Sequence, residues 1–182
     1  MRHGVGTPAA PAGRAVTTPL PYLTGYPPHV LAQVAGLISE GRLAAVVRQR
    51  YPQGHEVRSD RALYDYVLAL KSEHLQRAEP LAKVAYDNKL KVIQHALGTH
   101  TRVSRVQGTQ LKAKREIRVA SLFKEAPAPF LRMIVVHELA HLKEREHDRA
   151  FYSLCTRMEP DYHQLEFDLR LQEVDVLLGV VE

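Results

Sequence analysis

Cysteine is nearly absent from this chain of 182 residues, and tryptophan is absent altogether. Because Cys155 is the only thiol, no intramolecular disulfide can form, and a disulfide framework of the kind found in small secreted domains is excluded. No apolar run approaches the roughly 18 residues that a membrane-spanning helix needs, and the N-terminus lacks the apolar core of a secretory signal. These absences predict a cytoplasmic protein without membrane association.

Apolar and charged residues are present in ordinary amounts, 45% and 25%, as in soluble globular proteins. The formal net charge of +5 is unevenly distributed. Residues 102–118 contain six Lys or Arg and one acidic residue, whereas residues 119–182 contain seven and twelve. The basic middle is suited to a phosphate-bearing partner, although a solvated basic segment is the plainer interpretation.

The chain divides into three parts. Residues 1–28 are rich in Pro, Gly, Ala and Thr and contain no acidic residue, which predicts a disordered leader. Residues 29–80 have apolar residues at helical spacing, which predicts an N-terminal helical segment packed on the core. Residues 81–182 form the remaining domain.

Within the helical segment, residues 29–50 form either one helix broken near Gly41 or two short helices. Asp60 is expected to cap the next helix, which ends before Pro80.

The remaining domain is expected to begin with a helix over residues 81–97. Residues 99–122 change character, because Thr, Val and basic residues alternate on both sides of a Gln-Gly-Thr turn. This pattern predicts a hairpin or small antiparallel sheet. Another helix is expected to start near Pro129.

The strongest signal is the segment HELAH, in which His137 and His141 are four residues apart and Glu138 follows the first histidine. On a helix this spacing places both imidazoles on one face, where they can reach one metal ion. Glu138 projects about 100° around the helix from His137, so it can reach a metal-bound water without ligating the metal. Zinc lowers the pKa of such a water to about 7. The motif therefore predicts one Zn²⁺ per chain, with Glu138 as the base that activates the water.

The surrounding residues predict that this helix is buried. Apolar side chains surround it almost completely: Met133, Ile134, Val135, Val136, Leu139, Ala140 and Leu142. Polar side chains inside such a helix need partners, because burying them unpaired costs free energy. A metal ion is the simplest partner, and histidines that are merely packed or hydrogen-bonded are the alternative.

A catalytic zinc usually has three protein ligands and one open position. His147 is the best third ligand and completes the pattern HExxH-x5-H. On an unbroken helix His147 would lie about 280° around and roughly 15 Å along from His137, so the helix must end after His141 and the chain must turn back. The other candidates for the third position are, in falling order, Glu144, Asp148, Glu166 and His163.

The same region resembles a known family. The matching segments are MIVVHELAHLKE at 133–144, His147, Phe151-Tyr152 and MEPDY at 158–162. They are similar to the YgjP-like family of small zinc-metallopeptidase-like proteins, which is related to SprT-like and WLM zincins. The resemblance covers about residues 80–178 and is densest over 130–163.

This resemblance implies a small zincin-like metallopeptidase domain over residues 81–182, with metal ligation by His137, His141 and His147 and catalysis by Glu138. With the expected hairpin, the fold class is α+β: a short antiparallel sheet packed on the HExxH helix, with N-terminal helices. Residues 115–122 resemble the zincin edge strand, which pairs with an extended peptide substrate. The chain departs from many relatives where they have a Trp-Gly-Ser-Cys segment.

Three functions from different classes remain open. The first is a zinc metallopeptidase acting on a peptide or protein. The second is a metal-dependent nucleoside triphosphate pyrophosphatase or phosphohydrolase. The third is a nucleic-acid-associated, SprT-like protein. The last two would use the basic residues Arg102, Arg105, Lys112, Lys114, Arg115 and Arg118. Few aromatic residues interleave these side chains, which disfavours base stacking.

Three further residues are weaker candidates. Tyr162 and His163 are possible donors of a hydrogen bond to an oxyanion. Cys155 lies at helical spacing from Phe151 and Met158, which indicates a core residue rather than a nucleophile.

Overall fold

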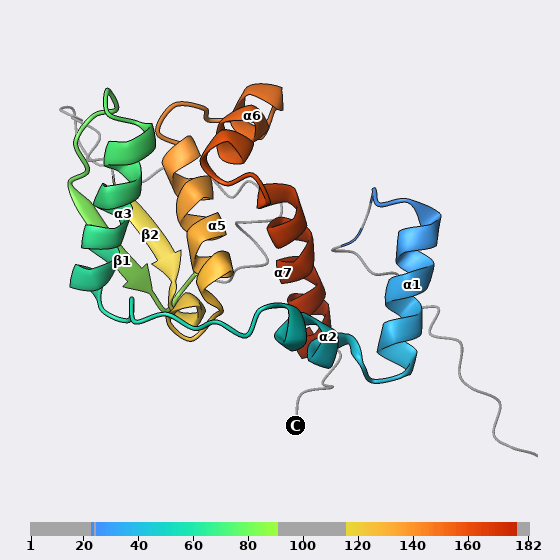
Figure 1. Cartoon of the computed structure of the whole chain (residues 1–182). Coiled ribbons are helices and arrows are strands. Elements are labelled where there is room, and N and C mark those ends of the chain that lie inside the picture. The colour runs from blue at the N-terminus through green and yellow to red at the C-terminus, as the bar shows by residue number, and fades with distance from the viewer. Residues whose placement is uncertain (1–22, 24, 91–115, 178–182) are drawn as a thin grey trace, which may run out of the picture.

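The computed structural model describes residues 23, 25–90 and 116–177. Helices dominate it, and two short strands lie between them (Figure 1). In chain order the elements are α1 (Pro28–Ser39), α2 (Leu43–Arg50), α3 (Asp60–His74), β1 (Lys83–Asp87), β2 (Glu116–Ala120), the short 3-10 helix η2 (Ser121–Lys124), α5 (Ala128–Ala140), α6 (Arg149–Met158) and α7 (Tyr162–Leu177).

The two strands are parallel, so the expected antiparallel arrangement is wrong. The register pairs Lys83 with Glu116 and Asp87 with Ala120. β1 falls in the segment that was expected to be a helix over residues 81–97, which is a second correction. Parallel neighbours need a long crossover rather than a tight turn, so the described partner of β2 lies far away in the sequence. The first half of that hairpin lies outside the described residues.

β2 confirms the alternation that the sequence indicates. Ile117 and Val119 are buried, whereas Arg118 between them is exposed. Arg118 reaches across to β1, where it donates to Asp87 Oδ2 at 3.0 Å. It also donates to Glu116 Oε2, on its own strand, at 3.2 Å. The polar face of the strand thus ties the two strands together.

A glycine separates α1 from α2, which settles the alternative in favour of two helices. Gly41 has φ +65°, a left-handed conformation that glycine adopts without a Cβ clash. Its N–H donates to the carbonyl of Ile38, and the next N–H, of Arg42, donates to the carbonyl of Leu37. These two bonds form a Schellman motif, which ends α1 and redirects the chain.

α3 begins one residue away from the expected cap. Ser59, not Asp60, is the N-cap, because its side chain accepts from the N–H of Ala62 at 3.1 Å. Asp60 Oδ1 instead accepts from the backbone N–H of Tyr86 at 2.9 Å. The carboxylate therefore joins α3 to β1.

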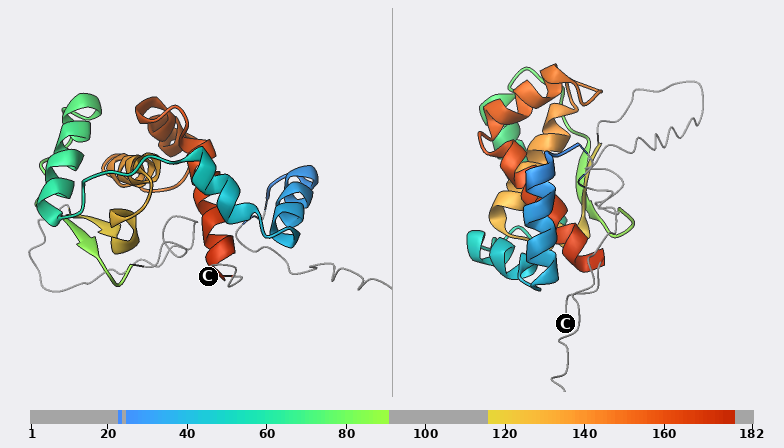
Figure 2. Two further views of the ribbon diagram at one scale, coloured as in Figure 1. Left: turned by 60° about the horizontal axis from the view of Figure 1, so that its bottom comes forward. Right: turned by 90° about the vertical axis from the view of Figure 1, so that its right-hand side faces the viewer.

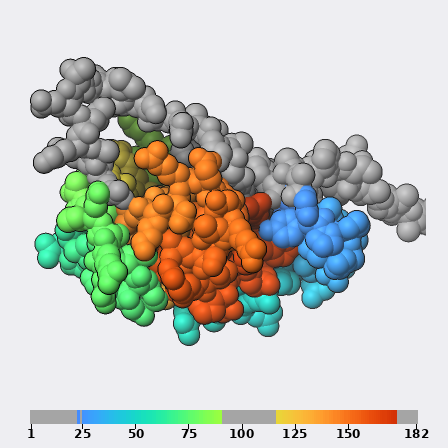
Figure 3. All heavy atoms as spheres, turned by 90° about the horizontal axis from the view of Figure 1, so that it is seen from above, coloured from blue at the N-terminus to red at the C-terminus, as the bar shows by residue number. Residues whose placement is uncertain are grey.

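α3 and α5 lie on the same side of the two strands (Figure 2). α5 is the central element: it contacts α3, β2, α6 and α7. Nine of its thirteen residues are buried, which confirms the expected apolar helix. Seen from above, α6 occupies the middle of one face and α1 lies at one end of the molecule (Figure 3).

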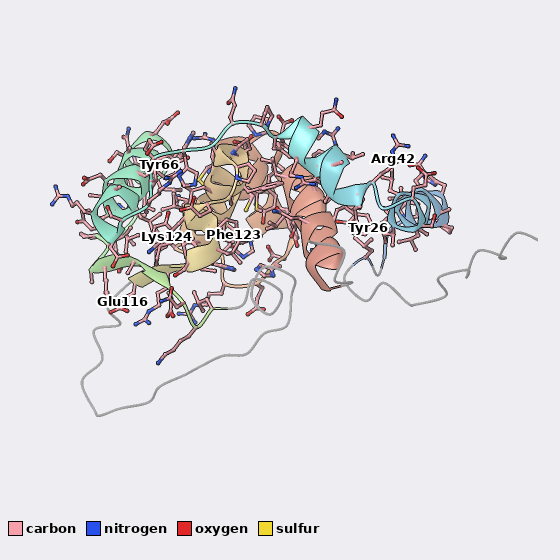
Figure 4. The ribbon with its side chains drawn as sticks, turned by 90° about the horizontal axis from the view of Figure 1, so that it is seen from below. Tyr26, Arg42, Tyr66, Glu116, Phe123 and Lys124 are labelled. Carbon is pink, nitrogen blue, oxygen red and sulfur yellow. The ribbon has the colours of Figure 1, made fainter. Side chains whose placement is uncertain are left out.

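The end of the expected leader is part of the fold. Leu23 is fully buried in the core. Tyr26 lies between α1 and α7 (Figure 4), and its ring centroid is 4.7 Å from that of Phe167. Residues 1–22 and residue 24 lie outside the described part of the chain.

Among the described residues, no helix by itself has the length and apolar character to cross a membrane. α1 and α2 meet that test only when taken together across a bend of 106°.

Candidate metal centre

The candidate metal centre forms where α5 ends. Ala140 is the last helical residue and His141 is the C-cap. The N–H groups of Lys143 and Glu144 both donate to the carbonyl of Ala140, at 3.0 Å, which closes the turn. His141 Nδ1 lies 2.9 Å from the carbonyl oxygen of Glu144. The chain therefore leaves the helix immediately after the motif, as the spacing to His147 requires.

α6 then starts on the returning chain. Asp148 is its N-cap, and the carboxylate accepts from the N–H of Phe151 at 3.0 Å. This cap fixes the residue that immediately follows His147 and so holds that histidine at the end of α5.

Three imidazoles converge as a result. His141 Nε2 lies 3.2 Å from His137 Nε2 and 3.0 Å from His147 Nε2. One nitrogen from each of the three rings lies within 4.8 Å of the others. His137 is buried, whereas His141 and His147 are partly exposed. The cluster is therefore deep on one side and accessible on the other.

The donor set fits a divalent metal ion. A carbonyl oxygen only accepts, so His141 Nδ1 must carry the hydrogen that it donates to Glu144. The Nε2 lone pair of neutral His141 then points at the other two imidazoles. Burial and the neighbouring imidazoles hold the pKa of His137 well below its usual 6.5, which keeps that ring in the neutral, ligating form. Converging lone pairs at such distances are stabilised by a shared cation.

Phe151 forms the wall behind the cluster. Its ring centroid lies 5.0 Å from that of His137, 4.7 Å from that of His141 and 4.6 Å from that of His147. The residue is fully buried on α6. In the sequence, Phe151 stands in a family-matching segment and at helical spacing from Cys155. Neither observation indicates its contact with the three histidines.

Glu138 lies on α5 next to His137 and is half-buried. Burial raises the pKa of its carboxyl to about 7. A divalent cation nearby would favour the carboxylate and lower that pKa. Within the part of the chain that the structure describes, Glu138 forms no side-chain hydrogen bond or ion pair.

The four rival third ligands are placed elsewhere. Glu144 contributes its backbone carbonyl to His141, and Asp148 caps α6. Glu166 accepts from Arg170 Nη2 at 3.2 Å. His163 is exposed, with its ring 5.3 Å from that of Tyr152. Among the described residues the structure gathers His147, and none of these four, with the HExxH histidines.

The two expected oxyanion donors differ in their burial. Tyr162 is fully buried, and its hydroxyl lies 2.7 Å from His137 Nδ1, the ring nitrogen that does not face the cluster. His163, the next residue, is exposed. This geometry favours a role for Tyr162 in holding His137, which the sequence alone did not suggest.

The basic segment is mostly outside the described residues, including Arg102, Arg105, Lys112, Lys114 and Arg115. Arg118 is described, and its two carboxylate partners raise the pKa of its guanidinium. Its charge is therefore already compensated within the sheet.

Comparison with known proteins agrees with this site. A family model described as "YgjP-like, metallopeptidase domain" matches residues 82–172. The chain is also 59% identical over 160 residues to a protein named UTP pyrophosphatase from Escherichia coli (strain K12), covering 88% of this chain and 96% of that relative. The chain belongs to the YgjP-like family. No solved structure matches it.

Membership of the YgjP-like family confirms the resemblance seen in the sequence, and the matched residues contain the whole histidine cluster and Glu138. The expectation of a metal-dependent hydrolytic enzyme is confirmed as well.

Proposed function

We propose that the chain hydrolyses its substrate with a water molecule that Glu138 activates, at a zinc ion held by His137, His141 and His147. The observation that carries this proposal is the convergence of three Nε2 atoms, 3.0 and 3.2 Å apart, on the helix that also presents Glu138. Three imidazoles suit zinc, and a fourth position is then open to water or substrate.

A zinc ion bound there would supply a Lewis acid that acidifies a water molecule and polarises the bond to be broken. Glu138 takes the proton from the attacking water and passes it to the leaving group. The position of Glu138 favours this exchange, because it follows His137 on the helix that carries two of the three clustered histidines.

For the substrate, UTP is the first compound to test. The relative named UTP pyrophosphatase is 59% identical and is matched over 96% of its length, which supports a shared substrate class. In this reaction the water oxygen bonds to the α-phosphorus, and the bridging bond to the β-phosphate breaks. UMP and pyrophosphate leave, and Glu138 receives the proton of the water.

The second candidate is peptide hydrolysis, because the matching family model is described as a metallopeptidase domain. Here the water oxygen bonds to the carbonyl carbon, the C–N bond breaks, and the proton held by Glu138 goes to the departing amine. The same residues serve both reactions, so the two reactions differ only in the substrate.

Nucleic-acid association stays a prediction, because it depends mainly on basic residues outside the described ranges.

The test is a comparison of zinc-loaded wild type with Glu138→Gln, using UTP, the other nucleoside triphosphates and a peptide library. We expect UTP to yield UMP and pyrophosphate, and the variant to keep zinc and fold while its rate falls by about 10²–10⁴-fold. Glu125→Gln is the matched control, because Glu125 is an exposed carboxylate with only a surface contact to Arg58 at 3.7 Å. Full turnover by a zinc-loaded Glu138→Gln variant would refute the mechanism. Cleavage of peptides but not nucleotides would favour the second candidate.

A further inference from the structure

His137 is the deepest of the three clustered histidines, and both of its ring nitrogens are engaged. Nε2 faces His141 at 3.2 Å, and Nδ1 lies 2.7 Å from the hydroxyl of Tyr162. His137 is 3% exposed and Tyr162 is 0% exposed. Water therefore has little access to this hydrogen bond, and Tyr162 sets the environment of Nδ1.

The direction of this hydrogen bond determines whether His137 can ligate. If the hydroxyl donates to Nδ1, the hydrogen of the neutral ring is on Nε2, which then cannot bind a metal ion. If Nδ1–H donates to the hydroxyl oxygen, Nε2 presents its lone pair to the cluster. The direction of this one hydrogen bond thus determines whether His137 can bind a metal ion through Nε2.

A third side chain favours the ligating direction. The thiol of Cys155, a buried residue of α6, lies close enough to Tyr162 to interact with its hydroxyl and can accept the hydroxyl hydrogen. A hydroxyl that donates its only hydrogen to the sulfur leaves its oxygen lone pairs for Nδ1–H of His137. The three groups then form one directed chain, from His137 through Tyr162 to Cys155.

The two rings are also aligned with each other. The rings of His137 and Tyr162 are nearly parallel, at 17°, with centroids 6.4 Å apart. This contact and the hydrogen bond together join the first residue of α7 to α5. For His141 the equivalent contact is made by a backbone carbonyl, that of Glu144.

We propose that Tyr162 is a positioning residue of the metal centre: its hydroxyl accepts from Nδ1–H of His137 and so directs the Nε2 lone pair at the bound ion. The proposal rests on the proposed function only in that the histidine cluster binds a metal. It assigns Tyr162 no contact with substrate, in place of the oxyanion role considered from the sequence.

The direct test is the zinc affinity of the full chain, measured by competition with a chelator, for wild type, Tyr162→Phe and Tyr152→Phe. Phenylalanine keeps the ring and its stacking and removes only the hydroxyl. We expect Tyr162→Phe to bind zinc about 10–100-fold more weakly, the usual effect of losing an outer hydrogen bond to a ligating histidine. Tyr152→Phe is the control: Tyr152 is half-buried in the same aromatic cluster, with its ring 6.3 Å from that of Tyr162. We expect it to bind zinc like wild type.

A second measurement tests the proposal on the wild-type chain, so its deciding result does not require that a variant folds. Long-range ¹H–¹⁵N spectra of the metal-free wild-type chain report which nitrogen of His137 carries the hydrogen. We expect Nδ1–H, and a mixture of tautomers in Tyr162→Phe. A wild-type spectrum with the hydrogen on Nε2 would overturn the proposal.

The outcomes separate this proposal from the proposed function. Equal zinc affinity in wild type and Tyr162→Phe would overturn the positioning role and leave the hydrolase intact. Weaker binding in Tyr162→Phe, with no hydrolysis of any substrate by zinc-loaded wild type, would support the positioning role and count against the hydrolase. A wild-type chain that binds no zinc would overturn both.

Discussion

The imidazole of His141 is held by the carbonyl of Glu144, three residues further along the chain, with Nδ1 2.9 Å from the oxygen. This bond does two things. It fixes the tautomer in which Nε2 carries the lone pair, and it stabilises the turn that brings His147 back to within 3.0 Å of the same nitrogen.

The first prediction concerns the third ligand. His147→Ala is expected to lower zinc affinity by more than the roughly 10–100-fold typical of outer-shell contacts, because a direct ligand is lost. Glu144→Ala is the matched variant. It keeps the backbone carbonyl that holds His141, so we expect its zinc content to equal that of wild type. Elemental analysis after dialysis against a weak chelator measures both. Loss of zinc from Glu144→Ala together with its retention by His147→Ala would show that the ligand is Glu144.

The second prediction concerns the end of the expected leader. Leu23 is fully buried, so Leu23→Ala is expected to lower the free energy of unfolding by about 2–5 kcal/mol. Leu122→Ala is the control, because Leu122 is 51% exposed and its truncation should cost less than about 0.5 kcal/mol. Removal of residues 1–27, which takes out both Leu23 and Tyr26, should destabilise the chain as well. Urea unfolding curves measure all three, and equal midpoints would contradict the prediction.

The third prediction concerns a buried carboxylate that joins α2 to α7. Asp168 is 3% exposed and accepts from Tyr51 at 2.6 Å, Arg50 at 3.1 Å and Gln164 at 3.0 Å. Asp168→Ala leaves these donors without their shared acceptor, so we expect a loss of about 2–4 kcal/mol in the free energy of unfolding.

The control for this change is Asp65→Ala, which breaks an exposed ion pair with Arg61 on α3. Such a pair contributes about 0.5 kcal/mol or less. Thermal unfolding of the two variants should therefore differ clearly, and similar melting temperatures would show that the Asp168 contacts contribute little.

The fourth prediction concerns the single cysteine. Burial raises the pKa of the Cys155 thiol to about 12. At pH 8 only about 10⁻⁴ of the folded chains would carry the reactive thiolate, so iodoacetamide should not label the native protein. Labelling should become complete in denaturant, and in the native protein it should accelerate only as the pH approaches 12. Rapid labelling of the folded chain at pH 8, followed by mass spectrometry, would contradict the prediction and the assignment of Cys155 to the core.

The sequence predicts the structure correctly where the determining interactions are local. The spacing of His137 and His141 on one helix face follows from helical periodicity alone. The apolar residues around the motif predicted the buried helix, and helical spacing predicted the core position of Cys155 beside Phe151 and Met158. Gly41 marked the break between α1 and α2, because few other residues tolerate its backbone conformation.

It failed where distant segments compete for the same partner. The segment Lys83–Asp87 has apolar residues compatible with a helix, yet it forms a strand, because pairing with Glu116–Ala120 satisfies its backbone and buries Val84 against the core. No local pattern states which segment a strand will pair with. The antiparallel arrangement was expected from the alternating residues on both sides of a Gln-Gly-Thr turn, and the parallel pairing of the two described strands contradicts it.

The site shows the same division. By itself the sequence determined that two histidines and a carboxylate lie together, since residues at i, i+1 and i+4 of one helix have fixed relative positions. Only the tertiary structure decided that His147 completes the cluster. The turn after His141 and the cap at Asp148 determine where the chain returns. The other four candidates were Glu144, Asp148, Glu166 and His163. Tyr162 reaches His137 from another helix, 25 residues further along the chain. That contact depends on how α7 packs against α5, and packing between helices is set by the whole core rather than by any segment of sequence.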